Sequence, residues 1–258
     1  MRWCTDSCRS APGPRPALER RHLRTSTRRA PSCGTTRPEV DPMDSPLLRR
    51  ISFAIGFAAA LLFLSQLGGD RTWVQVGIKA VPCSLMALMV VVARPGRVGL
   101  LIAGGLALSV AGDVLLEVPA DLFVPGLIAF LTAHLVYIGA FVMKWRSAAL
   151  PALAVFALWG GGAFAFLLPE LGDLTIPVGV YCLVIAAMGW RSAAGLGRGD
   201  DAAKRTALLA LVGAVLFMFS DTVLAINKFH TPFEGARYLN LSAYWGGQLL
   251  LCMAGRRL

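Results

Sequence analysis

Eight apolar runs of about 17 to 22 residues follow one another from residue 50 to the C-terminus. A helix needs about 20 mostly apolar residues to cross a bilayer. The runs lack the polar face that a helix of a water-soluble bundle presents to solvent. We therefore predict an all-α integral membrane bundle of eight transmembrane helices, over residues 50–67, 73–93, 98–117, 122–143, 149–168, 174–190, 205–226 and 238–254.

The loops between these runs are short, so neighbouring helices are predicted to be antiparallel, and basic residues alternate between the two sides. Because cytoplasmic loops are enriched in Lys and Arg, the basic side is predicted to be cytoplasmic, together with both termini. The side with few basic residues carries Arg71, Lys228 and Arg237. The rich side carries Arg49, Arg50, Arg94, Arg97, Lys144, Arg146, Arg191, Arg198, Lys204, Arg205, Arg256 and Arg257.

Composition supports the membrane assignment and separates off an N-terminal segment. The chain is 56% hydrophobic and has a mean hydropathy of +0.62, above the 45–50% apolar content typical of soluble domains. Residues 1–50 hold 11 of the 25 Lys and Arg residues. We predict that residues 1–48 are a disordered basic tail and that residues 49–258 are the transmembrane domain. Membrane orientation explains the net charge of +10, so no nucleic-acid partner is predicted.

Two carboxylates lie inside apolar runs, Asp113 in the third run and Asp221 in the seventh. An ionised side chain at the bilayer centre costs about 2.5–3.5 kcal/mol on insertion scales, so such residues are usually functional. The two aspartates stand 108 residues apart on helices of the same direction. This spacing suggests two four-helix halves in a parallel repeat, with the carboxylates facing each other across a cleft.

Further polar residues are predicted to lie near the level of these aspartates, toward the side opposite the termini. Four of them have a plainer alternative: Lys79 can snorkel to the interface, Tyr181 and Tyr244 can belong to an aromatic belt, and His134 can be a satisfied interhelical hydrogen-bonding group. Glu117 and Asp121 flank a turn and are predicted to be solvated. The residues predicted to converge on the level of the aspartates are Lys79, His134, Tyr137, Tyr181, Tyr244 and Gln248.

Four motifs in order give the chain a resemblance to the YhhN/lysoplasmalogenase family of membrane proteins. They are Gly112-Asp113-Val-Leu-Leu, then Phe123-x-x-Gly126-x-x-x-Phe130-x-x-x-His134-x-x-Tyr137, then Ser220-Asp221 followed by Asn227-Lys-Phe229, and Tyr244-Trp-Gly-Gly-Gln248. Lys79-Ala-Val-Pro82 matches a further feature of the second helix. The resemblance covers about residues 50–256, so the tail is a departure that leaves the site untouched.

The resemblance implies hydrolysis of the vinyl ether bond of lysoplasmalogens to a fatty aldehyde and a glycerophospho head group, with Asp113 and Asp221 as the catalytic residues. Two carboxylates suit this chemistry, because one can donate a proton while the other stabilises a cation and activates water. Neither a metal nor an organic cofactor is expected. The supporting residues are Lys79, His134, Tyr137, Tyr181, Ser220, Asn227, Tyr244 and Gln248.

Several alternatives stay open at this point. The same Asp, His and Lys residues would suit a proton-coupled transporter of a small solute or lipid, and a lipid-binding scaffold would not require both aspartates. The expected partners are a lysophospholipid and the bilayer, with a homodimer left open, and the expected location is the plasma (inner) membrane. Arg237, His230 and Lys228 are candidates for contact with the lipid head group. The sequence does not identify which aspartate is the acid.

Overall fold

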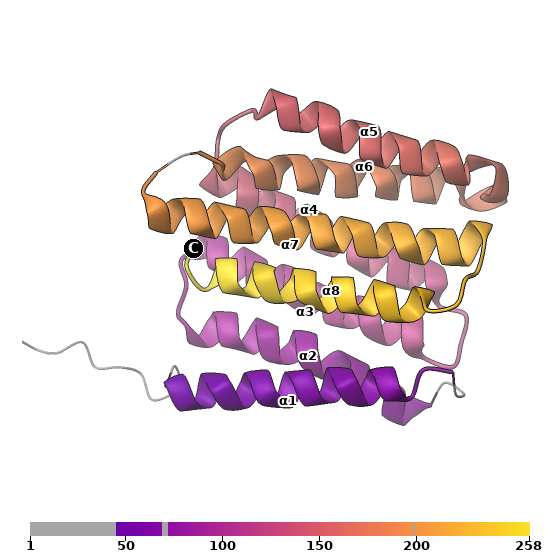
Figure 1. The fold of residues 1–258 in the computed structure, drawn as a ribbon, viewed down its shortest axis with the longest axis horizontal. Helices are drawn as coiled ribbons and strands as arrows, with labels where there is room; N and C mark the ends of the chain where they lie inside the picture. The colour runs from indigo at the N-terminus through magenta and orange to yellow at the C-terminus, as the bar shows by residue number, and fades with distance from the viewer. Residues whose placement is uncertain (1–44, 69–71, 198) are drawn as a thin grey trace, which may run out of the picture. The chain divides into compact units, whose positions relative to one another are not determined.

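The computed structural model describes residues 45–68, 72–197 and 199–258. Within these residues the chain is all-α, and its eight α-helices lie along a common axis, with successive helices antiparallel (Figure 1). Residues 1–44 of the predicted tail lie outside the described residues, as do Arg71 and Arg198, so the disorder of that part stays a prediction, whereas residues 46–48 belong to the first helix. The helices are α1 (Pro46–Ser65), α2 (Trp73–Val92), α3 (Arg97–Glu117), α4 (Phe123–Lys144), α5 (Leu150–Leu167), α6 (Thr175–Ser192), α7 (Asp201–Ala225) and α8 (Ala236–Gly255).

The eight predicted helices are confirmed. Most of the predicted helix ends lie within two residues of the observed ones, because each helix begins and ends close to the limits of its apolar run. Among the described residues, seven helices, α1 to α7, are long and apolar enough to cross a membrane. Helix α8 is not one of the seven because it carries polar residues, among them Arg237, Asn240 and Gln248. The fold is that of an integral membrane bundle.

Local sequence signals account for several of the helix starts. A capping box begins α2: Thr72 Oγ1 accepts from the Gln75 N–H at 3.2 Å, and Gln75 Oε1 accepts from the Thr72 N–H at 3.1 Å. The Asp200 carboxylate caps α7 by accepting from the Ala203 N–H at 2.8 Å. Such caps satisfy amide groups that have no partner within the helix.

Some of the helix contacts are paired as a parallel repeat would pair them, whereas α3 packs on α8 without a comparable contact of α7 with α4 among the described residues, so the repeat stays a prediction. The two most extensive pairs are α3 with α4 and α7 with α8; α1 with α2 then corresponds to α5 with α6, and α2 with α8 corresponds to α4 with α6. Gly213 and Gly247 let α7 and α8 approach closely, since a Cβ on either glycine would lie within 3 Å of the other's carbonyl oxygen. Gly213 stands 108 residues after Gly105, the spacing of the two aspartates.

Candidate active site

A cavity of about 530 Å³ lies among α2, α3, α4, α7 and α8, near the loop of residues 118–122 and the π-helical turn Ile226–His230. Both Asp113 and Asp221 line it. The cavity is at the end of the bundle away from the described termini, where α3 and α7 finish and α4 and α8 start. The structure therefore brings the two predicted carboxylates to one shared space.

Asp113 is held from α8 and indirectly from α2. The Tyr244 hydroxyl donates a hydrogen bond of 2.7 Å to Asp113 Oδ2, and the Cys83 thiol donates to the Tyr244 hydroxyl at 3.3 Å. Asp113 is only 2% exposed. The residue before it, Gly112, leaves room for the Phe130 ring, because a Cβ at that position would lie 2.5 Å from a ring carbon. The carboxyl group is therefore buried and held in position by a hydrogen bond.

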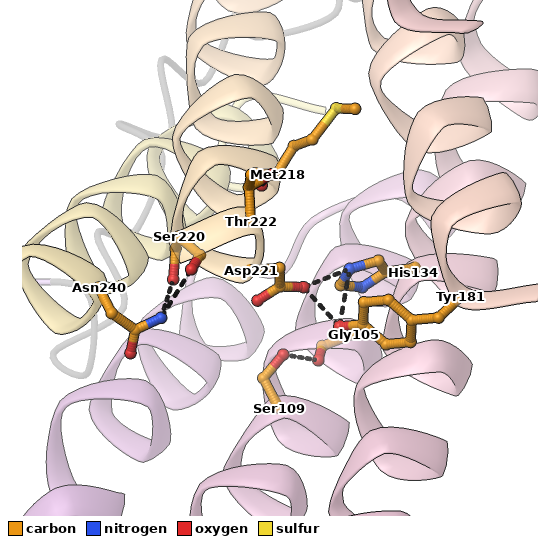
Figure 2. A network of polar contacts seen from close by, with 9 residues as sticks. All are labelled: Gly105, Ser109, His134, Tyr181, Met218, Ser220, Asp221, Thr222 and Asn240. Carbon is orange, nitrogen blue, oxygen red and sulfur yellow. Dashed lines mark hydrogen bonds and ion pairs between the residues drawn. The ribbon is translucent and has the colours of Figure 1, made fainter. Parts of the chain in front are cut away.

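Asp221 is held from α4 and α6. The Tyr181 hydroxyl donates to Asp221 Oδ2, and His134 Nε2 lies 3.3 Å from the same oxygen (Figure 2). Tyr181 Oη and His134 Nε2 are 3.4 Å apart. His134 is fully buried, and its Nδ1 has no hydrogen-bond partner among the described residues. When Nε2 carries the ring proton, both side chains donate to the Asp221 carboxylate.

Four of the predicted site residues, His134, Tyr137, Tyr181 and Gln248, do not line the cavity. His134 and Tyr181 contact Asp221 from behind, whereas Tyr137 and Gln248 contact each other. The Tyr137 hydroxyl donates to Gln248 Oε1 at 2.8 Å, and both side chains are fully buried between α4 and α8. Buried polar groups normally have such partners. In this structure the pair joins two helices behind the cavity.

Ser220 and Asn227 line the cavity beside Asp221. The Asn240 amide, which sequence reasoning missed, donates to the Ser220 carbonyl oxygen at 2.8 Å and to its hydroxyl at 2.9 Å (Figure 2). Asn227 Oδ1 accepts from the Phe233 N–H at 3.3 Å. Asn240 therefore ties the first turns of α8 to the end of α7.

A three-residue charge cluster lies on the cavity wall, and here the prediction of a solvated Glu117 is wrong. Glu117 is 2% exposed; Lys79 Nζ lies 3.0 Å from its Oε2, and Arg237 Nη2 lies 3.0 Å from its Oε1. Glu117 follows Asp113 by four residues, so the two lie on one face of α3. Lys79 is buried and paired, which excludes snorkelling, whereas Asp121 is exposed as predicted.

Of the three residues predicted as candidates for contact with the head group, two line the cavity and one does not. Arg237 and Lys228 line the cavity, whereas His230 does not and instead lies against the Phe166 ring, with centroids 4.4 Å apart. Lys228 Nζ lies 5.1 Å from the centre of the Phe123 ring. Among the described residues no group of three or more His, Cys, Asp or Glu side chains is arranged to hold a metal ion.

A narrow apolar slot of about 50 Å³ adjoins the cavity, between α4, α5, α6 and α7. The slot and the cavity share Asp221 and four apolar residues, among them Phe123 and Phe130. Its other walls include Leu127, Leu167 and Met218. Asp221 thus stands at the junction between a polar and an apolar compartment.

Similarity to other proteins covers the part of the chain that builds this cavity. Human lysoplasmalogenase TMEM86B is 32% identical over 228 residues, 87% of this chain and 91% of that protein. Bovine lysoplasmalogenase TMEM86A is 33% identical over 192 residues, 71% of this chain and 78% of that protein. A lysoplasmalogenase of Mycobacterium tuberculosis is 34% identical over 174 residues, 64% of this chain and 63% of that protein. No solved structure is significantly similar to this chain. Residues 74–255 match the model of the YhhN family, and the chain therefore belongs to that family.

Proposed function

We propose that the protein hydrolyses the vinyl ether bond of lysoplasmalogens to a fatty aldehyde and a glycerophospho head group. The observation that carries the proposal is the pair of carboxylates, Asp113 and Asp221, on one cavity. The similarity to proteins named lysoplasmalogenase, which extends over 87% of the chain in the human case, supports the choice of substrate. The relatives compared above carry the name of a hydrolase and not of a transporter.

The reaction needs three things from the protein: a proton for the β-carbon, a negative group near the resulting oxocarbenium ion, and a base for the attacking water. We assign the proton to Asp113, whose carboxyl group is buried and accepts from Tyr244. Asp221 receives contacts from Tyr181 and His134 on one oxygen, which suits an anion beside a cation. Asp221 then takes a proton from water. The hemiacetal then collapses to the aldehyde: Asp221 returns its proton to the leaving glycerol oxygen, and Asp113 takes the proton of the hemiacetal hydroxyl, which restores both carboxyl groups.

The two compartments match the two ends of a lysoplasmalogen. The cavity lining includes cationic and amide side chains among apolar and acidic ones, and these cations and amides suit a glycerophospho group. The slot is lined mainly by apolar side chains and would receive the first carbons of the alkenyl chain. Because Asp221 borders both compartments, the vinyl ether, which joins chain to glycerol, would lie beside it.

A direct test supplies purified protein in detergent with lysoplasmenyl-ethanolamine and measures aldehyde release. We expect turnover of this lipid and none of its saturated 1-O-alkyl analogue, which has no double bond to protonate. Absence of aldehyde from every vinyl ether lipid, with folded protein, would contradict the proposed function.

Tyr181→Phe is expected to lower kcat by roughly 10²-fold, because it removes a donor from the carboxylate that stabilises the transition state. KM should change little, since the hydroxyl contacts Asp221 and not the head-group end of the cavity. Tyr238→Phe, at a tyrosine that is 48% exposed, is the matched control and should keep the wild-type rate. Equal rates for the two variants would remove Tyr181 from the mechanism.

We also propose that the protein lies in the plasma membrane with both termini in the cytoplasm, on the basis of the basic loops. A cysteine introduced at Ala120 or at Leu196, both exposed and at opposite ends of the bundle, reports the orientation once Cys4, Cys8 and Cys33 are changed to Ser. The protein with only the three remaining cysteines, Cys83, Cys182 and Cys252, is the control for background labelling. A membrane-impermeant maleimide should label position 120 in intact cells and position 196 only after lysis. The reverse pattern would overturn this orientation.

A further inference from the structure

The cavity wall formed by α2, α3 and α8 carries polar side chains in two layers. The inner layer is the chain of hydrogen bonds from Cys83 through Tyr244 to Asp113. The outer layer, nearer the loops, is the cluster of Lys79, Glu117 and Arg237. Each layer takes one residue from each of the same three helices.

The separation of the layers follows from the sequence. Lys79 precedes Cys83 by four residues on α2, and Glu117 follows Asp113 by four residues on α3. Four residues of an α-helix rise by about 6 Å. The antiparallel directions of α2 and α3 place both outer residues toward the same end, so on these two helices the layers are about one helical turn apart. On α8 Tyr244 follows Arg237 by seven residues, about two turns, and the Arg237 side chain spans the difference to reach Glu117.

The outer layer has an excess of positive charge. Two cations share the single carboxylate of Glu117, so the cluster carries one positive charge in excess. Lys228 adds a cation and Asp121 a carboxylate to the cavity lining, which leaves this excess unchanged. Glu117 and Lys79 are buried, whereas the Arg237 side chain is 41% exposed. Glu117 contacts one nitrogen of the Arg237 guanidinium, Nη2. The planar fork of an Arg side chain offers five N–H donors and suits phosphate groups.

We propose that the Lys79–Glu117–Arg237 cluster binds the phosphodiester of the lipid substrate, with Glu117 as the residue that positions both cations. The proposal rests on the proposed function for the identity of the lipid. Five bonds separate the sn-1 oxygen of a glycerophospholipid from its phosphorus atom, a span comparable with one helical turn. A phosphate held in the outer layer therefore places the sn-1 vinyl ether at the level of Asp113.

Binding of a water-soluble head group tests the site without hydrolysis. Calorimetric titration of the protein in detergent with sn-glycero-3-phosphocholine is compared with titration with inorganic phosphate and with glycerol. We expect the glycerophosphodiester to bind, and Arg237→Gln to weaken it by about tenfold or more, as loss of a charged hydrogen bond implies. Arg97→Gln, at an exposed arginine that begins α3 at the opposite end of the bundle, should bind like the wild type.

Two results would overturn the proposal. The first is equal affinity of Arg237→Gln and wild type for glycerophosphocholine. The second is binding of inorganic phosphate as tight as that of the glycerophosphodiester, which would indicate a site for a free anion and not for a lipid head group.

An activity measurement distinguishes a failure of this proposal from a failure of the proposed function. The wild type should prefer lysoplasmenyl-choline to 1-alkenylglycerol, which lacks the phosphate, and Arg237→Gln should reduce that preference through KM with kcat largely kept. If glycerophosphocholine binds as expected but no vinyl ether lipid is hydrolysed, the proposed function fails while the phosphate site stands. If both lipids are hydrolysed equally well by the wild type, the phosphate site fails while the proposed function stands.

Discussion

Asp113→Asn and Asp221→Asn are each expected to lower the rate of aldehyde release from lysoplasmenyl-ethanolamine by at least about 10³-fold, near the upper part of the range for general acid–base catalysis. An amide cannot donate the proton that the β-carbon needs, and it cannot supply the negative charge that the oxocarbenium ion needs. Asn has nearly the shape of Asp, so the packing around Tyr244 and Tyr181 should persist.

The measurement pairs aldehyde release with a melting temperature in the same detergent, so that loss of activity is separated from loss of fold. Asp173→Asn, at an exposed carboxylate in the loop between α5 and α6, is the matched control and should keep the wild-type rate. Wild-type reaction in D₂O should add one deuterium at C2 of the aldehyde, because the proposed step protonates that carbon. Turnover close to the wild-type rate by either Asn variant would contradict the two-carboxylate mechanism.

The two aspartates were predictable because a polar residue is easily recognised within an apolar run of the sequence. A carboxylate in a bilayer-spanning helix costs free energy unless it is paired or functional, which singles out Asp113 and Asp221 from sequence alone. Their shared cavity required one further step, the equal direction of the third and seventh helices. In the structure α3 and α7 both end at the level of the cavity, and both aspartates line it.

The outer layer was not predictable in the same way, because it depends on helix rotation. Glu117 is the last residue of α3, and a carboxylate at a helix end beside a turn is usually solvated. The signal that was available is its spacing of four residues from Asp113, which puts both on one helix face. Asn240 had no such signal, since its contact with Ser220 depends on how α8 crosses α7.

The positions of the helices could be predicted from the sequence better than the contacts between helices that are not neighbours in the chain. Helix bounds follow from run length and from caps such as Thr72 with Gln75. Short loops fix sequential neighbours such as α3 and α4, but they do not determine that α4 packs on α6 or that α2 packs on α8. Those contacts set the partners of Asp221 and Asp113, so the assignment of Tyr181 and Tyr244 to particular aspartates required the structure.

Glu117→Leu is expected to destabilise the bundle by about 3–5 kcal/mol, the usual result of removing one member of a buried ion pair. The substitution leaves the Lys79 ammonium group buried, at 6% exposure, without its carboxylate. Arg237 loses the same partner at less cost, because its side chain is 41% exposed and can be solvated. The free energy of unfolding is measured by titration with SDS in mixed micelles.

The double variant Lys79→Met with Glu117→Leu separates the two roles of the cluster. Replacing both members of a buried ion pair by apolar residues is often close to neutral, so the double variant should recover most of the lost stability. Glu170→Leu, at an exposed carboxylate, should change stability by no more than about 0.5 kcal/mol. If the cluster binds phosphate, the refolded double variant should still bind glycerophosphocholine more weakly than the wild type, because only Arg237 remains and nothing positions it. A double variant that is as unstable as Glu117→Leu alone would show that the buried charge of Lys79 is not the cause of the loss.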